Sequence, residues 1–426
     1  MTAIAEAGMV FAPEAHERMH PKAAREPLPP PVLAGEPVHV LAWRLFDYDG
    51  RELTYGGLQR WLLSLAELLN AAGHPVVVHQ RAHRSFTREF MRGITVVGHR
   101  ASARAWGSPI FNAKVHRAIP AGAPVVYMVE DLTWPICRER SVVVQHGIWW
   151  DGEYGGLKLR MAEHVARHAV RRTGATVCVD TNFVNWFRAR WPESGLDERF
   201  AFVPNFVDPV QWGPQPEAPA AARLVRDGRL VVCFPRRSEP RRGIWLMADA
   251  TPILARRFPS LDFRFVVGSG YHTEALRTRL TDAGIDARRW TTEVLPFDGM
   301  RAAYVDSAIV TVPTVCGEGT SLSAIEAMYF GCAVVATWVG GLPNVIRDGI
   351  DGVLIPPSAP ALVDAIARLV EHPTERIAMG RRAMETAREA FGIARWRRGV
   401  APVIGRALAL PRLLQRKSDE LPRHHD

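Results

Sequence analysis

The chain has 426 residues, of which 47% are hydrophobic and 23% are charged. This length corresponds to two or three domains, and the composition excludes a mostly disordered chain, a collagen-like fibre and a small disulfide scaffold. The net charge is +9, from 53 Lys and Arg against 44 Asp and Glu. The excess is concentrated in residues 81–117 and 376–417, which favours anionic partners such as phosphates or acidic lipid surfaces.

The cysteines and the N-terminus predict a cytoplasmic location, and the basic segments favour a peripheral position at the inner face of the cell membrane. The five cysteines are odd in number and form no CxxC pair, which indicates thiols in a reducing compartment. The N-terminal segment has no early positive charge and contains Glu6 and Glu14, unlike a secretory signal. The longest uncharged stretch, residues 327–346, contains Gly331 and Pro343 and predicts a helix end, a strand and a turn.

The first half of the chain predicts alternating strands and helices after a flexible tail. Residues 1–36 are rich in Pro, Ala and charge, which is typical of a flexible N-terminal tail. Strand-like residues 38–43 are followed by helical spacing at 57–72 and by a second strand at 76–78. The same alternation continues to residue 208 and predicts a parallel sheet that helices cover on both sides.

A linker and a second α/β series are predicted to follow. Residues 209–228 contain the sequence GPQPEAPAAA, which is typical of a linker. The predicted fold class is α/β, with two doubly wound Rossmann-like domains, 37–208 and 229–390, that face a central cleft. Ligands of such folds bind at the carboxyl ends of the strands.

Two patterns that could hold a metal are attributed to chance or to turns, so no metal site is expected. Residues 16–20 match HExxH, but prolines flank them and the segment offers no packed helix face. Asp47 and Asp49 have DxD spacing, but a glycine follows and predicts a turn. The chain has no complete Rossmann glycine fingerprint, and no basic helix suited to reading DNA, so no nucleic-acid partner is expected.

The most informative segment is residues 313–352. A strand is predicted to end before it, a loop carries Glu318, and a helix begins near Ser321 with Glu326 about a turn and a half inside. The free N–H groups at such a helix start bind phosphate. The two carboxylates, eight positions apart, can therefore flank a phosphate and hold hydroxyls on either side. The alternative is that Glu318 only complements the helix dipole and that Glu326 is a solvated helix residue.

A second candidate site lies after the first strand of the second domain. Arg237 and Arg242 stand five positions apart across the predicted strand-to-helix turn. Two guanidinium groups at such a turn can bind a diphosphate. The alternative is an exposed loop that happens to be rich in arginine.

Together these segments resemble glycosyltransferase family 4 (group 1), whose members are retaining nucleotide-sugar transferases of the GT-B fold. The resemblance covers nearly all of residues 38–400. It is strongest at 313–357, where the Glu-x7-Glu spacing, a Val-Gly-Gly element and an Asp-Gly-x-x-Gly element occur together. It implies that Glu318 faces the sugar and that Glu326 holds the ribose hydroxyls. It also implies that residues 391–426 hold a helix that packs back towards the N-terminal domain, and then a tail.

The resemblance also assigns roles to other residues. Arg237 and Arg242 are expected on the diphosphate, with Arg242 in place of the family's Lys. His146 resembles the family's His that meets the donor sugar. Gly56 and Gly57 resemble its glycine loop near the acceptor and phosphate, where glycine permits close approach of the backbone; a plain turn at a helix start is the alternative. The amides expected at the donor are those of Gly319, Thr320, Ser321 and Leu322.

The predicted activity is that of a retaining, metal-independent glycosyltransferase of the hexosyltransferase type. It would move a sugar from a nucleoside diphosphate sugar to a glycan or lipid-linked acceptor in polysaccharide or glycoconjugate biosynthesis. No cofactor is expected, since the nucleotide sugar is a substrate. No protein nucleophile is apparent, which agrees with the family's same-face mechanism. Two alternatives remain: a nucleotide-sugar epimerase on the same fold, and a non-catalytic sugar-binding module.

A membrane partner is predicted from the basic segment 81–117. Its bases alternate with bulky apolar side chains, among them Phe86, Phe90, Met91 and Phe111. Basic and apolar groups so interleaved suit shallow insertion at the headgroups of an anionic membrane. The alternatives are that the apolar residues belong to the core, or that the arginines bind a soluble acidic acceptor.

Overall fold

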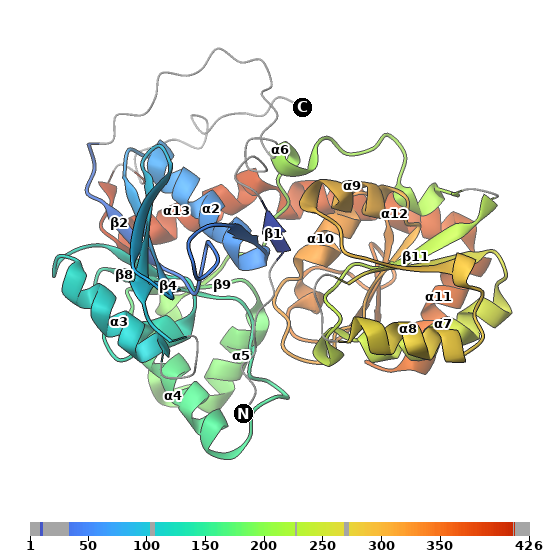
Figure 1. The fold of residues 1–426 in the computed structure, drawn as a ribbon, viewed down its shortest axis with the longest axis horizontal. Coiled ribbons are helices and arrows are strands. Elements are labelled where there is room, and N and C mark those ends of the chain that lie inside the picture. Colours follow the sequence, from blue (N-terminus) through green and yellow to red (C-terminus); the bar gives the residue numbers. More distant parts are fainter. Residues whose placement is uncertain are drawn as a thin grey trace, which may run out of the picture.

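The computed structural model of the protein describes residues 9–11, 34–102, 107–225, 228–267, 272–411 and 413. Two sheets, one from each half of the chain, lie side by side with helices on their faces (Figure 1). The predicted α/β class with two doubly wound units is confirmed. The HExxH pattern, most of the predicted N-terminal tail and the C-terminal tail from residue 414 lie outside the described residues.

The first sheet has eight strands in the order β10-β9-β8-β7-β2-β4-β6-β5. All neighbours are parallel except the edge strand β5, which is antiparallel to β6. Strands covered by helices on both sides are apolar on both faces. The bounds are β2 (Val38–Leu41), β4 (Val76–Ala82), β5 (Phe86–Met91), β6 (Ile94–Arg100), β7 (Val125–Tyr127), β8 (Ser141–Gln145), β9 (Ala175–Cys178) and β10 (Phe200–Phe202).

Helices connect these strands much as the apolar spacing predicts. The first of them, α2 (Gly57–Ala71), buries Trp61, Leu62 and Leu65 against the sheet. A separate pair of short strands, β1 (Met9–Phe11) and β3 (Leu53–Tyr55), runs antiparallel nearby. The other helices of this half are α3 (Gly107–Ala118), η1 (Glu130–Thr133), α4 (Gly156–Arg172) and α5 (Thr181–Arg190).

The second sheet has six strands, all parallel, in the order β13-β12-β11-β14-β15-β16. Its strands are β11 (Leu230–Phe234), β12 (Leu261–Val266), β13 (Trp290–Glu293), β14 (Ile309–Val312), β15 (Ala333–Thr337) and β16 (Val353–Ile355). Its helices are α7 (Ile244–Arg257), α8 (Thr273–Asp282), α9 (Phe297–Val305), α10 (Leu322–Tyr329), α11 (Ala359–Glu371) and α12 (Pro373–Phe391), and α6 (Pro209–Trp212) precedes them.

The last helix, α13 (Ile393–Ala407), returns to the first half and lies beside α2 (Figure 1). Trp396, Val400 and Ile404 are buried in the same apolar cluster as residues of β2 and α2. The ring of Trp396 contacts that of Trp61, with centroids 5.2 Å apart. The end of the described chain therefore completes the core of the first half. No helix within the described ranges is both long and apolar enough to cross a membrane.

Candidate active site

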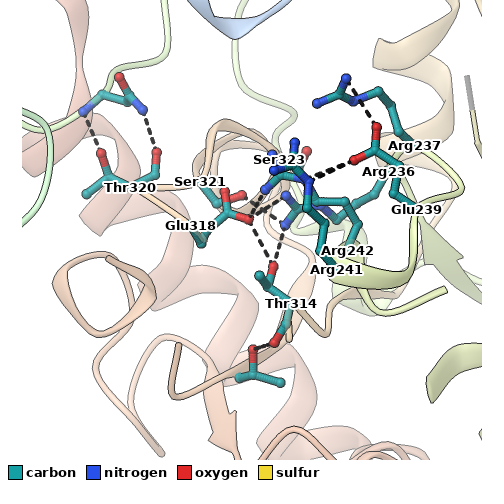
Figure 2. Close-up of polar contacts among 12 residues, drawn as sticks. Arg236, Arg237, Glu239, Arg241, Arg242, Thr314, Glu318, Thr320, Ser321 and Ser323 are labelled. Carbon is teal, nitrogen blue, oxygen red and sulfur yellow. Dashed lines mark hydrogen bonds and ion pairs between the residues drawn. The ribbon is translucent and has the colours of Figure 1, made fainter. Parts of the chain in front are cut away.

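Glu318 lies in the loop between β14 and α10 and is almost fully buried, with 7% of its surface exposed. Its Oε2 accepts hydrogen bonds from Arg236 Nη2 and Arg242 Nη1, each at 2.6 Å, and from Thr314 Oγ1 at 2.9 Å (Figure 2). Burial raises the pKa of Glu318, but the two guanidinium groups outweigh burial and hold the pKa at about 2. The carboxylate is therefore ionised at any physiological pH.

Arg236, which the sequence analysis missed, is the cation that accompanies Arg242 at Glu318. Its Nη1 also donates to Thr314 Oγ1 at 3.1 Å and to Ser321 Oγ at 3.3 Å. Arg237 instead forms an ion pair with Glu239 at 3.3 Å, and its side chain is 38% exposed (Figure 2). Consecutive side chains leaving a strand point to opposite sides, so only one of two adjacent arginines reaches the buried carboxylate. The spacing of the arginines gave no indication of which one.

The N-terminus of α10 faces this pair of cations. Ser321 precedes the helix, but its side chain does not cap it, since its hydroxyl accepts from Arg236. The first N–H groups of a helix have no partner within the helix and carry partial positive charge. One carboxylate, two guanidinium groups and a helix N-terminus together leave an excess of positive charge, which favours an anion with the charge of a diphosphate.

Glu326, one and a half turns into α10, is also buried, at 3% exposure. Its Oε1 lies 2.5 Å from Nη1 of Arg60, which belongs to α2 in the other half of the chain. Its Oε2 accepts a hydrogen bond from the hydroxyl of Tyr304 at 2.9 Å. Burial raises the pKa of Glu326, and Arg60 and Tyr304 oppose that rise. The alternative of a solvated helix residue is therefore wrong for Glu326.

The loop before α10 is fastened to the first half of the chain. Thr320 Oγ1 donates to the carbonyl of Val179 at 2.9 Å, and Asn205 Nδ2 donates to the carbonyl of Thr320 at 2.6 Å. A Cβ on Gly57 would lie 2.8 Å from Leu322 Cδ1, so the start of α2 touches the start of α10. The predicted glycine loop and the predicted donor segment are thus in contact.

His146 follows β8 and also meets this loop. A Cβ on Gly319 would lie 2.7 Å from the carbonyl oxygen of His146, so the two backbones touch. The imidazole packs edge-on against Trp61, with ring centroids 5.9 Å apart. Loss of hydration lowers the pKa of His146 to about 4, so the ring is neutral at pH 7. Within the described part of the chain, its buried Nε2 has no hydrogen-bond partner.

The Val-Gly-Gly element packs against the same loop. A Cβ on Gly340 would lie 2.1 Å from the carbonyl oxygen of Glu318, and its φ of +57° is one that few other residues adopt. The N–H of Gly341 donates to that same carbonyl at 3.0 Å. Glycine at 340 therefore allows the backbone to hold the Glu318 loop in place.

Comparison with known proteins agrees with this geometry. Residues 228–372 match the family described as Glycosyl transferases group 1. A phosphatidyl-myo-inositol mannosyltransferase of Mycolicibacterium smegmatis is 27% identical over 341 residues, covering 78% of this chain and 85% of that protein. A D-inositol 3-phosphate glycosyltransferase of Kribbella flavida is 32% identical over 196 residues, covering 44% and 46%.

Solved structures share the fold at low sequence identity. Sucrose-phosphate synthase from Thermosynechococcus elongatus has a TM-score of 0.70 and 18% identity, covering 89% of this chain and 99% of that one. Anabaena Alr3699/HepE in complex with UDP-glucose has a TM-score of 0.68 and 17% identity, covering 87% and 99%. The chain is a group 1 glycosyltransferase with the GT-B fold.

In this glycosyltransferase, the residues singled out from the sequence gather around one loop at the start of α10. Glu318 and Arg242 contact each other directly, and Gly57 and His146 approach the same loop from the other half. Arg237 alone among the predicted cations lies apart from Glu318, on Glu239. The structure adds three residues to the predicted site: Arg236, Arg60 and Tyr304.

The candidate metal pattern at Asp47 is used in a turn. Its Oδ1 accepts the N–H of Arg51 at 2.7 Å, and Asp49 lies 3.1 Å from the ring of His83. Among the described residues, no group of three or more His, Cys, Asp and Glu side chains is arranged to hold a metal ion.

Proposed function

We propose that this glycosyltransferase moves a sugar from a nucleoside diphosphate sugar to a lipid-linked or glycan acceptor, with retention of the anomeric configuration and without a metal ion. The observation that carries the proposal is the ionised Glu318, held by Arg236 and Arg242 at the N-terminus of α10. These groups combine an anion site for a departing diphosphate with a carboxylate that can orient the sugar.

The chemistry follows from the charges of the site. As the bond to the sugar breaks, negative charge develops on the diphosphate, and Arg236, Arg242 and the first amides of α10 are placed to stabilise it. Glu318 is a poor nucleophile, because, despite burial, Arg236 and Arg242 lower its pKa to about 2 and so weaken the carboxylate as a base. Retention is therefore assigned to attack on the face that the diphosphate leaves, with the acceptor proton passing to the leaving phosphate. The neutral His146 and Glu318 would position the sugar, and Glu326 would hold the ribose hydroxyls.

Similar proteins support the substrate class. Several relatives are phosphatidyl-myo-inositol mannosyltransferases, and one is named as a GDP-mannose-dependent enzyme. We infer a sugar nucleotide as donor and an acceptor that carries a polyol or sugar on a lipid, within glycoconjugate biosynthesis. An epimerase would change the sugar without an acceptor, and a binding module would leave the sugar nucleotide intact.

The donor is tested by thermal unfolding in the presence of UDP, GDP and ADP and of their sugars. A ligand at 100 times its Kd should stabilise the protein by about 2.7 kcal/mol, and one nucleotide series should exceed the others. If no nucleotide and no nucleotide sugar raises the unfolding temperature, the proposed donor site is refuted. Turnover should also survive an excess of chelator, and loss of activity that Mg²⁺ restores would contradict metal independence.

The proposed membrane contact needs a different surface from the aromatic residues of segment 81–117. Phe111 is fully buried, and Phe90 packs edge-on against Phe46. The predicted insertion of Phe111 into a membrane is therefore wrong, and Phe90 is partly buried against the core. On α4, by contrast, Leu157 is 76% exposed and Met161 is 47% exposed. These two residues lie one turn apart on one face.

Exposed basic side chains lie on the same helix as this apolar pair. The exposed basic residues of α4 are Lys158, Arg160, Arg167, Arg171 and Arg172. Such a helix face suits the headgroups of an anionic membrane. Just before α4, Glu153 forms an ion pair at 3.2 Å with Arg241 in the other half. The surface therefore adjoins the boundary between the halves, where a lipid-linked acceptor would enter.

Flotation with vesicles that contain anionic lipid tests this surface. Binding should weaken as salt rises, because exposed charges are screened beyond about 8 Å at physiological ionic strength. Leu157→Ser with Met161→Ser should weaken it further, whereas Ile253→Ser, at an exposed position of α7, should not. A protein that ignores anionic vesicles even at low salt uses a soluble acceptor. The triple replacement of Arg84, Arg88 and Arg92 shows whether the segment 81–117 contributes.

A further inference from the structure

One buried ion pair joins the two halves of the molecule within the candidate site. Arg60 Nη1 lies 2.5 Å from Glu326 Oε1, and the two side chains are only 13% and 4% exposed. The first belongs to α2, which packs in the core of the first half, and the second to α10 of the second half. A pair so shielded from water interacts more strongly than an exposed one, and loss of one partner leaves the other charge buried alone.

The surroundings of Arg60 fix where its guanidinium lies. Its helix begins at Gly57, which is pressed against Leu322 at the start of α10. One turn later, the guanidinium carbon of Arg60 lies 5.8 Å from the ring centroids of both Trp212 and Phe297, where cation–π attraction favours it. Arg60 therefore reaches across the boundary between the halves into a polar and aromatic setting.

The carboxylate of Glu326 keeps unused acceptor sites in this arrangement. Arg60 contacts Oε1 and Tyr304 contacts Oε2. Each oxygen of an ionised carboxylate has a second lone-pair site, so both can still accept a hydroxyl of a ribose. Arg60 keeps the carboxylate ionised and oriented, whereas Tyr304 alone would restrain one oxygen.

We propose that Arg60 is a positioning residue for the donor: it reaches from the acceptor-side half and fixes the Glu326 carboxylate, so that the ribose-binding group is in place only when the two halves are together. This inference rests on the proposed role of Glu326 at the donor. It makes donor affinity depend on α2, although the proposed donor residues of α10 and its loop lie in the other half of the chain.

The test compares donor and acceptor kinetics of Arg60→Ala, Arg60→Gln and Arg60→Lys. Arg60→Ala should raise the donor KM by about tenfold or more, with the acceptor KM within about twofold. Arg60→Lys, which keeps the charge, should recover part of the loss. Glu153→Gln removes a second ion pair that joins the halves in the described part of the chain, Arg241 with Glu153, and should leave the donor KM unchanged. If the alanine variant does not fold, Arg60→Gln replaces it in the same comparison of donor and acceptor KM.

A pH profile separates positioning from a general loss of structure. The charged and titratable groups that act on Glu326 are Arg60 from α2, Tyr304 from α9 and Arg236 from the loop after β11. Without Arg60, burial raises the pKa of Glu326 with less opposition. The donor KM of Arg60→Ala should therefore rise as pH falls from 8 to 6, more steeply than that of the wild type. Arg60→Ala should add little to the donor KM of Glu326→Gln.

The outcomes distinguish this inference from the proposed function. If Glu326→Gln leaves the donor KM unchanged, the proposed donor role of Glu326 is wrong. If Glu326→Gln raises the donor KM but every Arg60 variant binds donor normally, the role of Arg60 is refuted. Equal increases of donor and acceptor KM, or full additivity with Glu326→Gln, would likewise contradict it.

Discussion

Glu318→Gln is expected to lower kcat by about 10²–10³-fold while the far-UV circular dichroism stays that of the wild type. The variant keeps the size of the side chain but removes the charge that Arg236 and Arg242 share. Both guanidinium groups would then lose the charged partner that orients them towards the diphosphate. Steady-state kinetics with saturating donor measure the loss.

Glu239→Gln is the matched control for Glu318. Glu239 is a neighbouring carboxylate that pairs with Arg237 and Arg241 and is more exposed than Glu318. Its replacement should reduce kcat by less than about tenfold, because partly exposed ion pairs contribute little. Near-wild-type turnover of Glu318→Gln, or an equal loss in the two variants, would refute the assignment of Glu318 to the reacting sugar.

Arg236→Ala is expected to reduce kcat/KM for the donor by about 10²–10³-fold, and Arg237→Ala by much less. The two residues are adjacent in sequence, but only Arg236 contacts Glu318, and its whole surface is 9% exposed. Arg242→Ala should raise the donor KM far more than the acceptor KM, since it contacts the same carboxylate oxygen.

This arginine pair offers a control within the chain itself. Arg236 and Arg237 have the same charge and nearly the same place in the sequence, so net charge and helix propensity change equally in the two variants. If Arg237→Ala reduced kcat/KM for the donor more than Arg236→Ala, the diphosphate would have to bind beside Arg237 and Glu239 instead. A defect in Arg242→Ala confined to the acceptor would show that the cations do not serve the donor.

The site around Glu318 could be predicted because its signals are local. A buried strand, a loop with a carboxylate and a helix start occur within a short stretch, and parallel α/β sheets place such loops at their ligand-binding edge. The same logic led to Arg242 after β11. It named Arg237 instead of the adjacent Arg236. The direction of a side chain just after a strand depends on the local backbone, which the sequence pattern does not reveal.

Contacts between distant segments could not be predicted. Arg60 and Glu326 are separated by more than half of the chain, and nothing near either residue indicates its partner. For Phe111, a membrane surface and a core position both remained open, because alternation of basic and apolar residues fits both a membrane surface and an amphipathic helix. The site is assembled when α2, α10 and α13 pack across the molecule.

The most direct test of the account is to follow the transfer product by NMR. The sugar nucleotide that stabilises the protein is incubated with a polyol- or sugar-bearing lipid acceptor, and the anomeric configuration of the new linkage is assigned. We expect release of the nucleoside diphosphate, a product with the configuration of the donor, and product formation that is about 10²–10³-fold slower with Glu318→Gln. An inverted linkage, a changed sugar in the absence of acceptor, or an intact sugar nucleotide with every acceptor would contradict it.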